Sequence, residues 1–290
     1  MNGVSVIVRF KEHMASASTT ERGIINYVLE NPEEAVQMSI HELARRSFVS
    51  ASAVTRLCKK TGFQNYKDYQ RSLSCELALR KETISQRTGE FEIRPEDSLD
   101  VLVENSFQRT ISSLDDTRSL LDIRILQHCV ELLVKAECVT FFGVGASLLV
   151  AKDAYLKFIR LKKRCQVYED QDAQLVLAKN MKRGEVAVLI SYSGRTEAIV
   201  EIARILRENA VPMIAITSFA ESPLRRWSTY NLYVSAAELD VTGGKLASRI
   251  SQLAIIDALY IAYFQRTYDK SADALHNTHL LKKGEEEWSD

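Results

Sequence analysis

The sequence predicts an all-helical domain followed by an α/β domain with a doubly wound, five-stranded parallel sheet. Two observations predict this fold class. Capping motifs and helical periodicity dominate the first 80 residues. Further along, apolar runs of strand length alternate with helical patterns, which is typical of a parallel sheet covered by helices. The predicted strands are 138–142, 165–169, 186–190, 212–217 and 231–235.

Length and composition agree with two domains. The chain has 290 residues, of which 46% are hydrophobic and 26% charged, so it can bury sizeable cores. The predicted organisation is a helix-turn-helix domain at 1–80, a polar linker at 81–97, an α/β domain with leading helices at 98–266 and a charged, peripheral tail at 267–290.

The sequence carries no signal for a membrane or for secretion. The longest apolar stretch, 253–264, contains Asp257 and is shorter than the ~18 residues that indicate a span. The first ten residues lack a basic segment and a small-residue cleavage site, so no secretory signal is expected. Five cysteines, all far apart, favour reduced thiols and a cytoplasmic location.

Two capping boxes mark the first predicted helices. Ser18-x-x-Glu21 begins a helix with one apolar face, and Pro32 ends it. Ser39-x-x-Glu42 begins a short second helix. A turn at 47–49 then leads to a third helix, and two short helices joined in this way are typical of a helix-turn-helix.

The third helix is expected to carry the DNA-binding side chains. It begins at the cap Ser50 and ends before Gly62. Small residues near its start would let it enter the major groove, and the later basic residues would meet phosphates or base edges. Alternatively, the basic residues are simply solvated. The predicted DNA-binding residues are Ser50, Ser52, Thr55, Arg56, Lys59 and Lys60. A small basic excess in the first 80 residues agrees with this placement.

The loop after the strand at 186–190 predicts an anion pocket. Ser191, Ser193, Gly194 and Thr196 lie between this strand and a helical pattern. Helix N-termini offer free N–H groups and positive partial charge, and hydroxyls can donate to phosphate oxygens. The loop has no P-loop lysine or spacing, which favours a single phosphate over a triphosphate. The alternative is that these hydroxyls only cap the helix.

A second loop of this kind follows the strand at 138–142. Its sequence is GVGAS, in which Gly145 allows close approach of a ligand and Ser147 supplies a hydroxyl. The rival interpretation is a dinucleotide fingerprint, but Leu148 stands at the third glycine position. Both loops follow carboxyl ends of parallel strands, where ligands of such sheets bind, so we expect one shared pocket.

Two further side chains are candidates for this pocket. Glu238 follows the last strand and could bind sugar hydroxyls, whereas Arg249 could contact the ligand or instead pair with Asp257 or cap a helix. His276-x-x-His279 supplies only two ligands at this spacing, so no metal site is expected. No cofactor is expected either.

These motifs together resemble a known family. Residues 125–265 resemble a SIS (sugar isomerase) domain, and about the first 75 resemble the helix-turn-helix domain of the RpiR family of bacterial transcription regulators. The resemblance implies that Ser147, Ser191, Ser193 and Thr196 hold the phosphate of a phosphosugar. It also implies that 50–63 forms the recognition helix, and that the Ser-Arg pair at 248–249 recurs in the same context.

One residue departs from the family pattern. Phe48 stands in the turn where the family usually has glycine. A bulky residue in a left-handed conformation costs on the order of 1 kcal/mol or more. We therefore expect either a rearranged turn or a useful packing contact of Phe48.

The resemblance implies a cytoplasmic, bacterial transcription regulator of sugar metabolism genes, and not an enzyme. The expected partners are double-stranded operator DNA, a small phosphosugar effector and a second copy of the chain, in a dimer or tetramer. The ligand would change the placement of the DNA-binding domains.

Two alternatives stay open. A phosphosugar isomerase would need a base, and the chain has no histidine from 129 to 275, which leaves Glu238, Glu197 or a partner's residue. A dinucleotide-sensing repressor would be stabilised by NAD or NADH but not by sugar phosphates.

Overall fold

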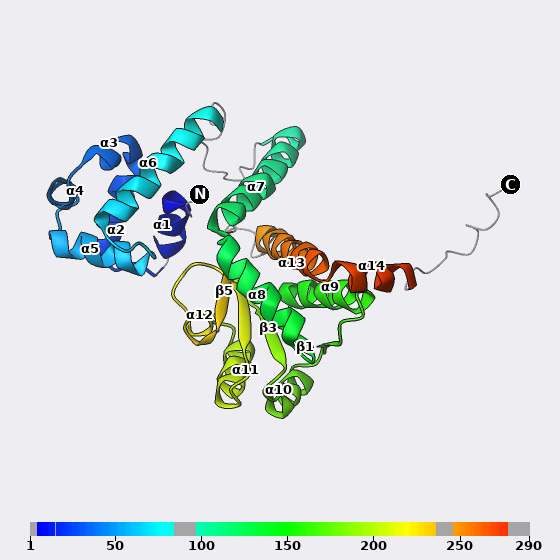
Figure 1. Cartoon of the computed structure of the whole chain (residues 1–290). Helices are drawn as coiled ribbons and strands as arrows, with labels where there is room; N and C mark the ends of the chain where they lie inside the picture. The colour runs from blue at the N-terminus through cyan, green and yellow to red at the C-terminus, as the bar shows by residue number, and fades with distance from the viewer. Residues whose placement is uncertain (1–4, 15, 84–96, 236–245, 278–290) are drawn as a thin grey trace.

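The computed structural model describes residues 5–14, 16–83, 97–235 and 246–277 (Figure 1). The described residues before the gap at 84–96 are helical. Their helices are α1 (Val6–Met14), α2 (Thr19–Glu30), α3 (Pro32–Gln37), α4 (Ile40–Arg46), α5 (Ala51–Lys60) and α6 (Tyr66–Thr83). Helix α6 therefore extends past residue 81, where the linker was expected to begin.

The capping signals form as the sequence predicts. The Ser18 hydroxyl accepts from the Glu21 N–H, while the Glu21 carboxylate accepts from the Ser18 N–H, which completes the capping box of α2. The hydroxyls of Ser39 and Ser50 cap α4 and α5 by accepting from the N–H groups of Glu42 and Ala53. Pro32, expected only to end α2, also begins α3, because its missing N–H is no loss in the first turn of a helix.

The apolar faces of these helices meet in one core. Ile25, Leu57 and Leu73 are fully buried there. The ring of Phe10 on α1 stacks on that of Tyr69 on α6, with centroids 5.6 Å apart. Helix α1, which no sequence motif marked, is thus part of the core.

The rest of the chain forms the predicted α/β architecture. All pairings in its sheet are parallel, in the order β2-β1-β3-β4-β5. The strands are β1 (Val139–Gly143), β2 (Cys165–Val167), β3 (Val186–Ile190), β4 (Met213–Thr217) and β5 (Tyr230–Tyr233). The predicted fold class is confirmed, although β2 ends two residues before the predicted limit and β5 begins one residue earlier.

Helices cover both faces of this sheet (Figure 1). One face packs against α8 (Ile123–Lys135), α9 (Ala146–Arg160) and α13 (Leu246–Arg266). The other packs against α10 (Gln171–Asn180), α11 (Glu197–Glu208) and α12 (Pro223–Trp227). Helix α7 (Leu99–Leu120) packs on α13. Among the described helices, none is both long and apolar enough to cross a membrane.

Part of the predicted peripheral tail forms a helix. Helix α14 (Tyr268–Asn277) begins within it, and its Ser271 and Ala274 are buried. The expectation of a peripheral tail is therefore wrong for this segment. Ser271 and Ala274 lie three positions apart, so they share one face of α14, and this face is buried.

Helix α1 also contacts the α/β domain. The Ser5 N–H donates to the Ser119 carbonyl over 3.1 Å. Val8 of α1 packs in a small cluster with Leu120 and Phe219. The first described helix therefore belongs to one core and touches the other domain.

Candidate functional site

The two predicted ligand loops meet at one edge of the sheet. Strands β1 and β3 are neighbours, with Gly143 opposite Ile190, so the loops that follow them lie side by side. A cavity of about 60 Å³ lies between the loops. Its lining includes the hydroxyls of Ser147, Ser191 and Thr196. One ordered water needs only ~10–15 Å³, so the cavity is larger than a water site.

The first loop turns tightly because glycine allows it. Gly145, at φ +60°, is the N-cap of α9. A Cβ atom at Gly143 would lie 2.7 Å from the Ser147 carbonyl oxygen, so no other residue fits this turn. The Ser147 hydroxyl donates to Oε1 of Gln252 over 3.3 Å. The glycine turn thus brings Ser147 to the cavity.

The second loop presents its hydroxyls to the cavity and to one another. The Ser191 and Thr196 oxygens are 3.2 Å apart and share a hydrogen bond. Thr196 is the N-cap residue of α11, yet its side chain makes no capping hydrogen bond. The capping-only interpretation is therefore wrong for Thr196, whose hydroxyl faces the cavity instead.

Ser193 and Gly194 lie in the same loop but play other parts. The Ser193 hydroxyl accepts from the Arg195 N–H over 3.2 Å, and Ser193 is not part of the cavity wall. Gly194 has a φ of +62° and packs closely against the loop that contains Ser222. A Cβ atom at Gly194 would lie only 2.8 Å from the Cβ of Ser222, so only glycine fits here. The structure thus places Ser191 and Thr196 at the cavity, with Ser193 beside it.

On α13 the cavity residue is Ser248 rather than Arg249. Ser248 is buried and lines the cavity, whereas Arg249 is exposed and has no ion-pair partner among the described residues. Asp257 pairs with Lys157 over 2.5 Å, so the alternative Arg249–Asp257 salt bridge is wrong. In the sequence, the only signal that could have identified Ser248 as a site residue was its place in the Ser-Arg pair at 248–249. Glu238 lies outside the described residues, as does His279 of the weighed metal motif.

The predicted DNA-binding residues divide into two groups along α5. Ser52, Arg56 and Lys59 are exposed. The hydroxyl of Thr55 donates to the Ala51 carbonyl over 3.1 Å, and that of Ser50 caps the helix. Ser52, Arg56 and Lys59 are thus accessible to a partner along this helix. Ser50 is exposed as well, although its hydroxyl caps the helix and shares a hydrogen bond with that of Ser52, and Thr55 bonds the helix backbone.

Lys60 differs from the other two basic residues of α5. Its ammonium donates to Glu21 Oε1 over 2.6 Å, and the Glu21 side chain is only 10% exposed. Burial alone would raise the pKa of Glu21, but hydrogen bonds from Lys60 and Ser18 outweigh burial and bring the pKa to about 2. Lys60 therefore has a structural role, which the sequence pattern alone did not reveal.

Phe48 adopts the left-handed conformation, and both expectations for this residue are wrong. Its φ is +55°, and its side chain is 97% exposed. The turn is therefore not rearranged to relieve the strain, and no packing of the ring compensates for it.

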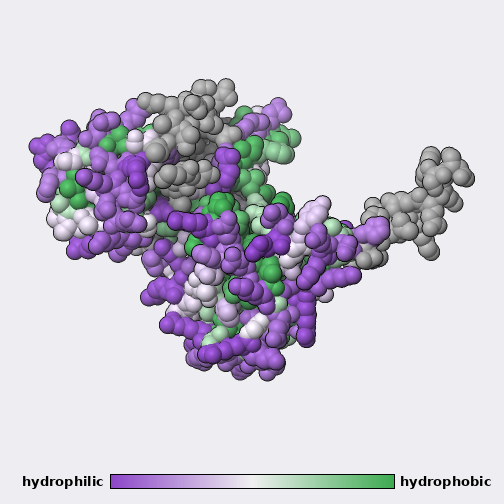
Figure 2. Space-filling view, in the orientation of Figure 1, coloured by the Kyte–Doolittle hydropathy of each residue, from purple (hydrophilic) through white to green (hydrophobic). Residues whose placement is uncertain are grey.

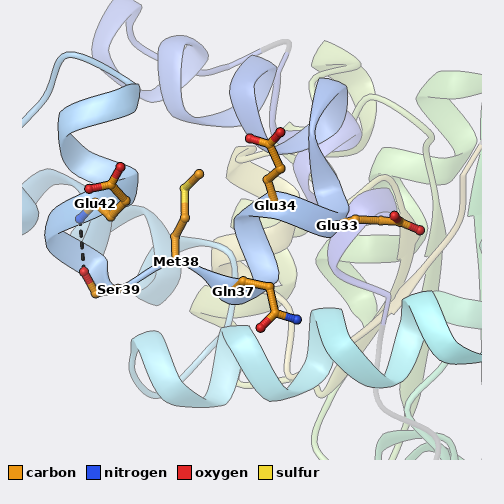
Figure 3. A pocket seen from close by; sticks show the side chains of 6 residues that line it. All are labelled: Glu33, Glu34, Gln37, Met38, Ser39 and Glu42. Atoms are coloured by element: carbon orange, nitrogen blue, oxygen red, sulfur yellow. Dashed lines mark hydrogen bonds between the residues drawn. The ribbon is translucent and has the colours of Figure 1, made fainter.

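One hollow on the helical domain is lined by acidic side chains. Its volume is about 620 Å³, and Figure 3 shows the side chains that line it on α3 and α4. They include Glu33, Glu34 and Glu42, and the dashed line marks the bond from the Glu42 N–H to Ser39. DNA binding relies on basic residues that neutralise phosphates, so this hollow is not suited to face the double helix.

Comparison with known proteins agrees with both parts of the chain. Residues 1–80 match the helix-turn-helix domain of the rpiR family, and residues 132–262 match the SIS domain. The chain is 33% identical to the HTH-type transcriptional regulator HexR of Pseudomonas aeruginosa, over 88% of this chain and 87% of that protein. It is 30% identical to HexR of Escherichia coli, over 94% and 92% of the two chains.

Solved structures resemble the chain over most of its length or over its α/β domain. The NanR protein of Vibrio vulnificus, complexed with ManNAc-6P, is 28% identical, with a TM-score of 0.58 over 94% of this chain and 96% of that one. The sugar isomerase domain of an RpiR transcription factor from Sphaerobacter thermophilus, at 20% identity and a TM-score of 0.56, shares the fold of the α/β domain. The helix-turn-helix match and the relatives along most of the chain show the same family. The chain belongs to the RpiR family of transcriptional regulators, and its relatives are regulators rather than enzymes.

Proposed function

We propose that this regulator binds one sugar phosphate between the β1–α9 and β3–α11 loops. The observation that carries the proposal is the cavity lined by Ser147, Ser191 and Thr196 at the carboxyl ends of neighbouring strands. NanR, a relative over most of the chain, is complexed with ManNAc-6P. The phosphate would be held by these hydroxyls and by N–H groups at the starts of α9 and α11. Gly145 lets the backbone approach it, and Gly194 lets its loop pack closely against Ser222.

The sugar would lie outside the small cavity, where more polar groups are available. Arg249 follows the cavity residue Ser248 and is exposed. We propose that it contacts the ligand there, together with Ser193 and Glu238. The ligand would change the affinity of the regulator for operator DNA, provided that it binds two arrangements of the chain unequally.

The DNA face in this proposal is the exposed side of α5. Arg56 and Lys59 would meet phosphates or bases, and Ser50, Ser52 and Thr55 would lie close to the groove at the start of the helix. Lys60 would contribute only if its ion pair with Glu21 opened. We propose that the controlled genes serve sugar metabolism in a bacterial cytoplasm.

An exposed apolar stripe supports self-association as a dimer or tetramer. Leu99, Val103 and Phe107 recur every four residues on α7 and are 75%, 49% and 66% exposed. Figure 2 shows hydrophobic colouring over this helix. Contiguous exposed apolar surface marks interaction sites, and operator-binding helix-turn-helix proteins use paired half-sites.

A thermal-shift panel tests the ligand. The probes are N-acetylmannosamine 6-phosphate, other sugar phosphates, inorganic phosphate and NAD. Stabilisation by a sugar phosphate is expected in the wild-type chain and should be clearly smaller in Thr196→Val, which removes one cavity hydroxyl while keeping the side-chain shape. Thr20→Val, which removes an exposed hydroxyl of α2, is the control. Stabilisation by NAD alone, or an undiminished response of Thr196→Val, would contradict the proposal.

A further inference from the structure

One side chain of α1 contacts both the recognition helix and the α/β domain. Nη1 of Arg9 donates to the carbonyl of Thr61, the C-cap residue of α5, over 2.7 Å. The Arg9 guanidinium carbon lies 4.9 Å from the centroid of the Phe63 ring and 5.3 Å from that of Phe219. Phe63 follows α5 and Phe219 follows β4, so Arg9 lies between the two domains.

The backbone at the end of α5 is shaped to admit this arginine. Gly62 has a φ of +85°, and a Cβ there would lie 2.7 Å from Nη1 of Arg9. Glycine thus permits both the turn and the close approach. Movement of the Arg9 guanidinium would therefore act directly on the end of α5.

On the other side, Phe219 is joined to the proposed phosphate loop. The Tyr192 carbonyl accepts from the Thr217 hydroxyl over 3.1 Å and from the Ser218 N–H over 2.8 Å. Tyr192 lines the cavity between the loops. Gly194 leaves no free space beside Ser222, so the two loops must move together.

Phe219 is held firmly in this loop. It is buried, and its ring packs edge-on against Tyr233 with centroids 4.8 Å apart. The guanidinium carbon of Arg225 lies 4.4 Å from the Phe219 centroid on the α12 side. A shift of the loop is thus carried to the ring that Arg9 faces.

Arg9 has room and an acceptor for a second arrangement. It lines a cavity of about 280 Å³ between α1, the start of α8 and β5, and Asn231 lines the same cavity. Nε of Arg9 and Oδ1 of Asn231 are both buried without a hydrogen-bond partner among the described residues. A buried polar group without a hydrogen-bond partner costs free energy, so a rearrangement that pairs these two atoms would be favoured.

We propose that Arg9 is the positioning residue that links the phosphosugar loop to the recognition helix. In the arrangement described here its guanidinium bonds the end of α5 through Thr61. In the second arrangement it turns toward Asn231 and releases that end of the helix. This inference rests on the proposed function, because it requires that a sugar phosphate shift the loop at 191–196.

The test measures linkage rather than binding alone. The full-length chain and its Arg9→Met, Phe219→Leu and Asn231→Leu variants are titrated with DNA that the wild type selects from a random pool. Each titration is repeated with saturating N-acetylmannosamine 6-phosphate, or with the panel sugar phosphate that stabilises the wild type. Calorimetry gives the affinity of every variant for that sugar phosphate. Lys11→Gln, an exposed change on the same helix, is the control.

The wild type and Lys11→Gln are expected to show a ligand-induced change in DNA affinity in the usual range of roughly 5–150-fold. In the three variants the change should fall to within about twofold, while the affinity for the sugar phosphate stays near that of the wild type. Circular dichroism melts check folding. If Arg9→Met does not fold, the Phe219 and Asn231 variants and the milder Arg9→Lys provide the same comparison.

The outcomes separate this inference from the proposed function. If all folded variants keep the full wild-type change, or if the wild type binds both partners without linkage, the role of Arg9 is overturned while the phosphosugar site stands. If the wild type binds no sugar phosphate, the proposed function fails and the role of Arg9 fails with it.

Discussion

Lys60 Nζ lies 2.6 Å from Oε1 of Glu21, so the end of α5 is held to the first turn of α2. The same carboxylate accepts from the Ser18 N–H, which makes the capping box part of an interhelical contact. The neighbouring Lys59 is exposed and has no ion-pair partner among the described residues. Adjacent lysines on one helix are therefore expected to act in different ways.

Exchange of each lysine for methionine separates stability from DNA binding. Lys60→Met should lower the free energy of unfolding by about 1–2 kcal/mol, because it leaves a mostly buried carboxylate without its cation. Lys59→Met should change stability by no more than about 0.5 kcal/mol but weaken DNA binding and reduce its salt dependence. Urea unfolding and DNA titrations at several salt concentrations measure both effects. Equal behaviour of the two variants would contradict this division.

Stability should fall in acid through Glu21. Its pKa is lowered from 4.5 to about 2 in the folded chain, so its contribution is complete above about pH 4.5 and is lost as the pH falls toward 2. Urea unfolding across this range should show a smaller pH dependence in Glu21→Gln. Burial lowers the pKa of His13 from 6.5 in the folded chain, so His13 destabilises the fold once the pH falls below about 6.5. This effect begins at a higher pH than that of Glu21 and can be separated from it. A slope between pH 4.5 and 2 that Glu21→Gln leaves unchanged would contradict the assignment.

Relief of the turn strain should stabilise the helical domain. Phe48→Gly should raise the free energy of unfolding by about 0.5–1 kcal/mol, because glycine removes a left-handed cost of about 1–2 kcal/mol but adds entropy to the unfolded chain. Phe48→Ala removes the exposed ring and keeps the strain, so it should bring no such gain. Thermal melts of the two variants provide the comparison, and equal stabilisation by both would point to the ring instead of the backbone.

The serines of the β3–α11 loop should both matter for ligand binding. Ser191→Ala should weaken binding of the sugar phosphate about tenfold, the loss of roughly one charge-assisted hydrogen bond. Ser193→Ala should also weaken it, provided that its hydroxyl leaves the Arg195 N–H when the ligand binds. Calorimetry measures both, with Ser106→Ala on the exposed face of α7 as the control. An unchanged affinity of Ser193→Ala would remove that residue from the site.

A charge on the α7 stripe should disrupt self-association. Phe107→Glu places a carboxylate in exposed apolar surface that would be buried between copies, and an unpaired buried charge is costly. Light scattering after size-exclusion chromatography should show a smaller assembly than for the wild type. Thr20→Glu puts the same charge on an exposed position of α2, outside the α7 stripe, and should have no such effect. An unchanged mass of Phe107→Glu would show that copies meet elsewhere.

Elements with local signals can be predicted from the sequence alone. The capping boxes at Ser18 and Ser39 predicted helix starts correctly, because a cap and its partner lie within one turn. The strands β1 and β3 were apparent as apolar runs, and the topology of parallel sheets then placed Ser147 and Ser191 at one edge.

Contacts between residues far apart in the sequence became apparent only in the folded chain. Lys60 contacts Glu21, Asp257 pairs with Lys157, and Arg9 reaches both Thr61 and Phe219. No periodicity encodes such pairs, because their contacts depend on how whole helices and loops pack. The division between the lysines of α5, and the link between α1 and both domains, therefore emerged only once the chain was folded.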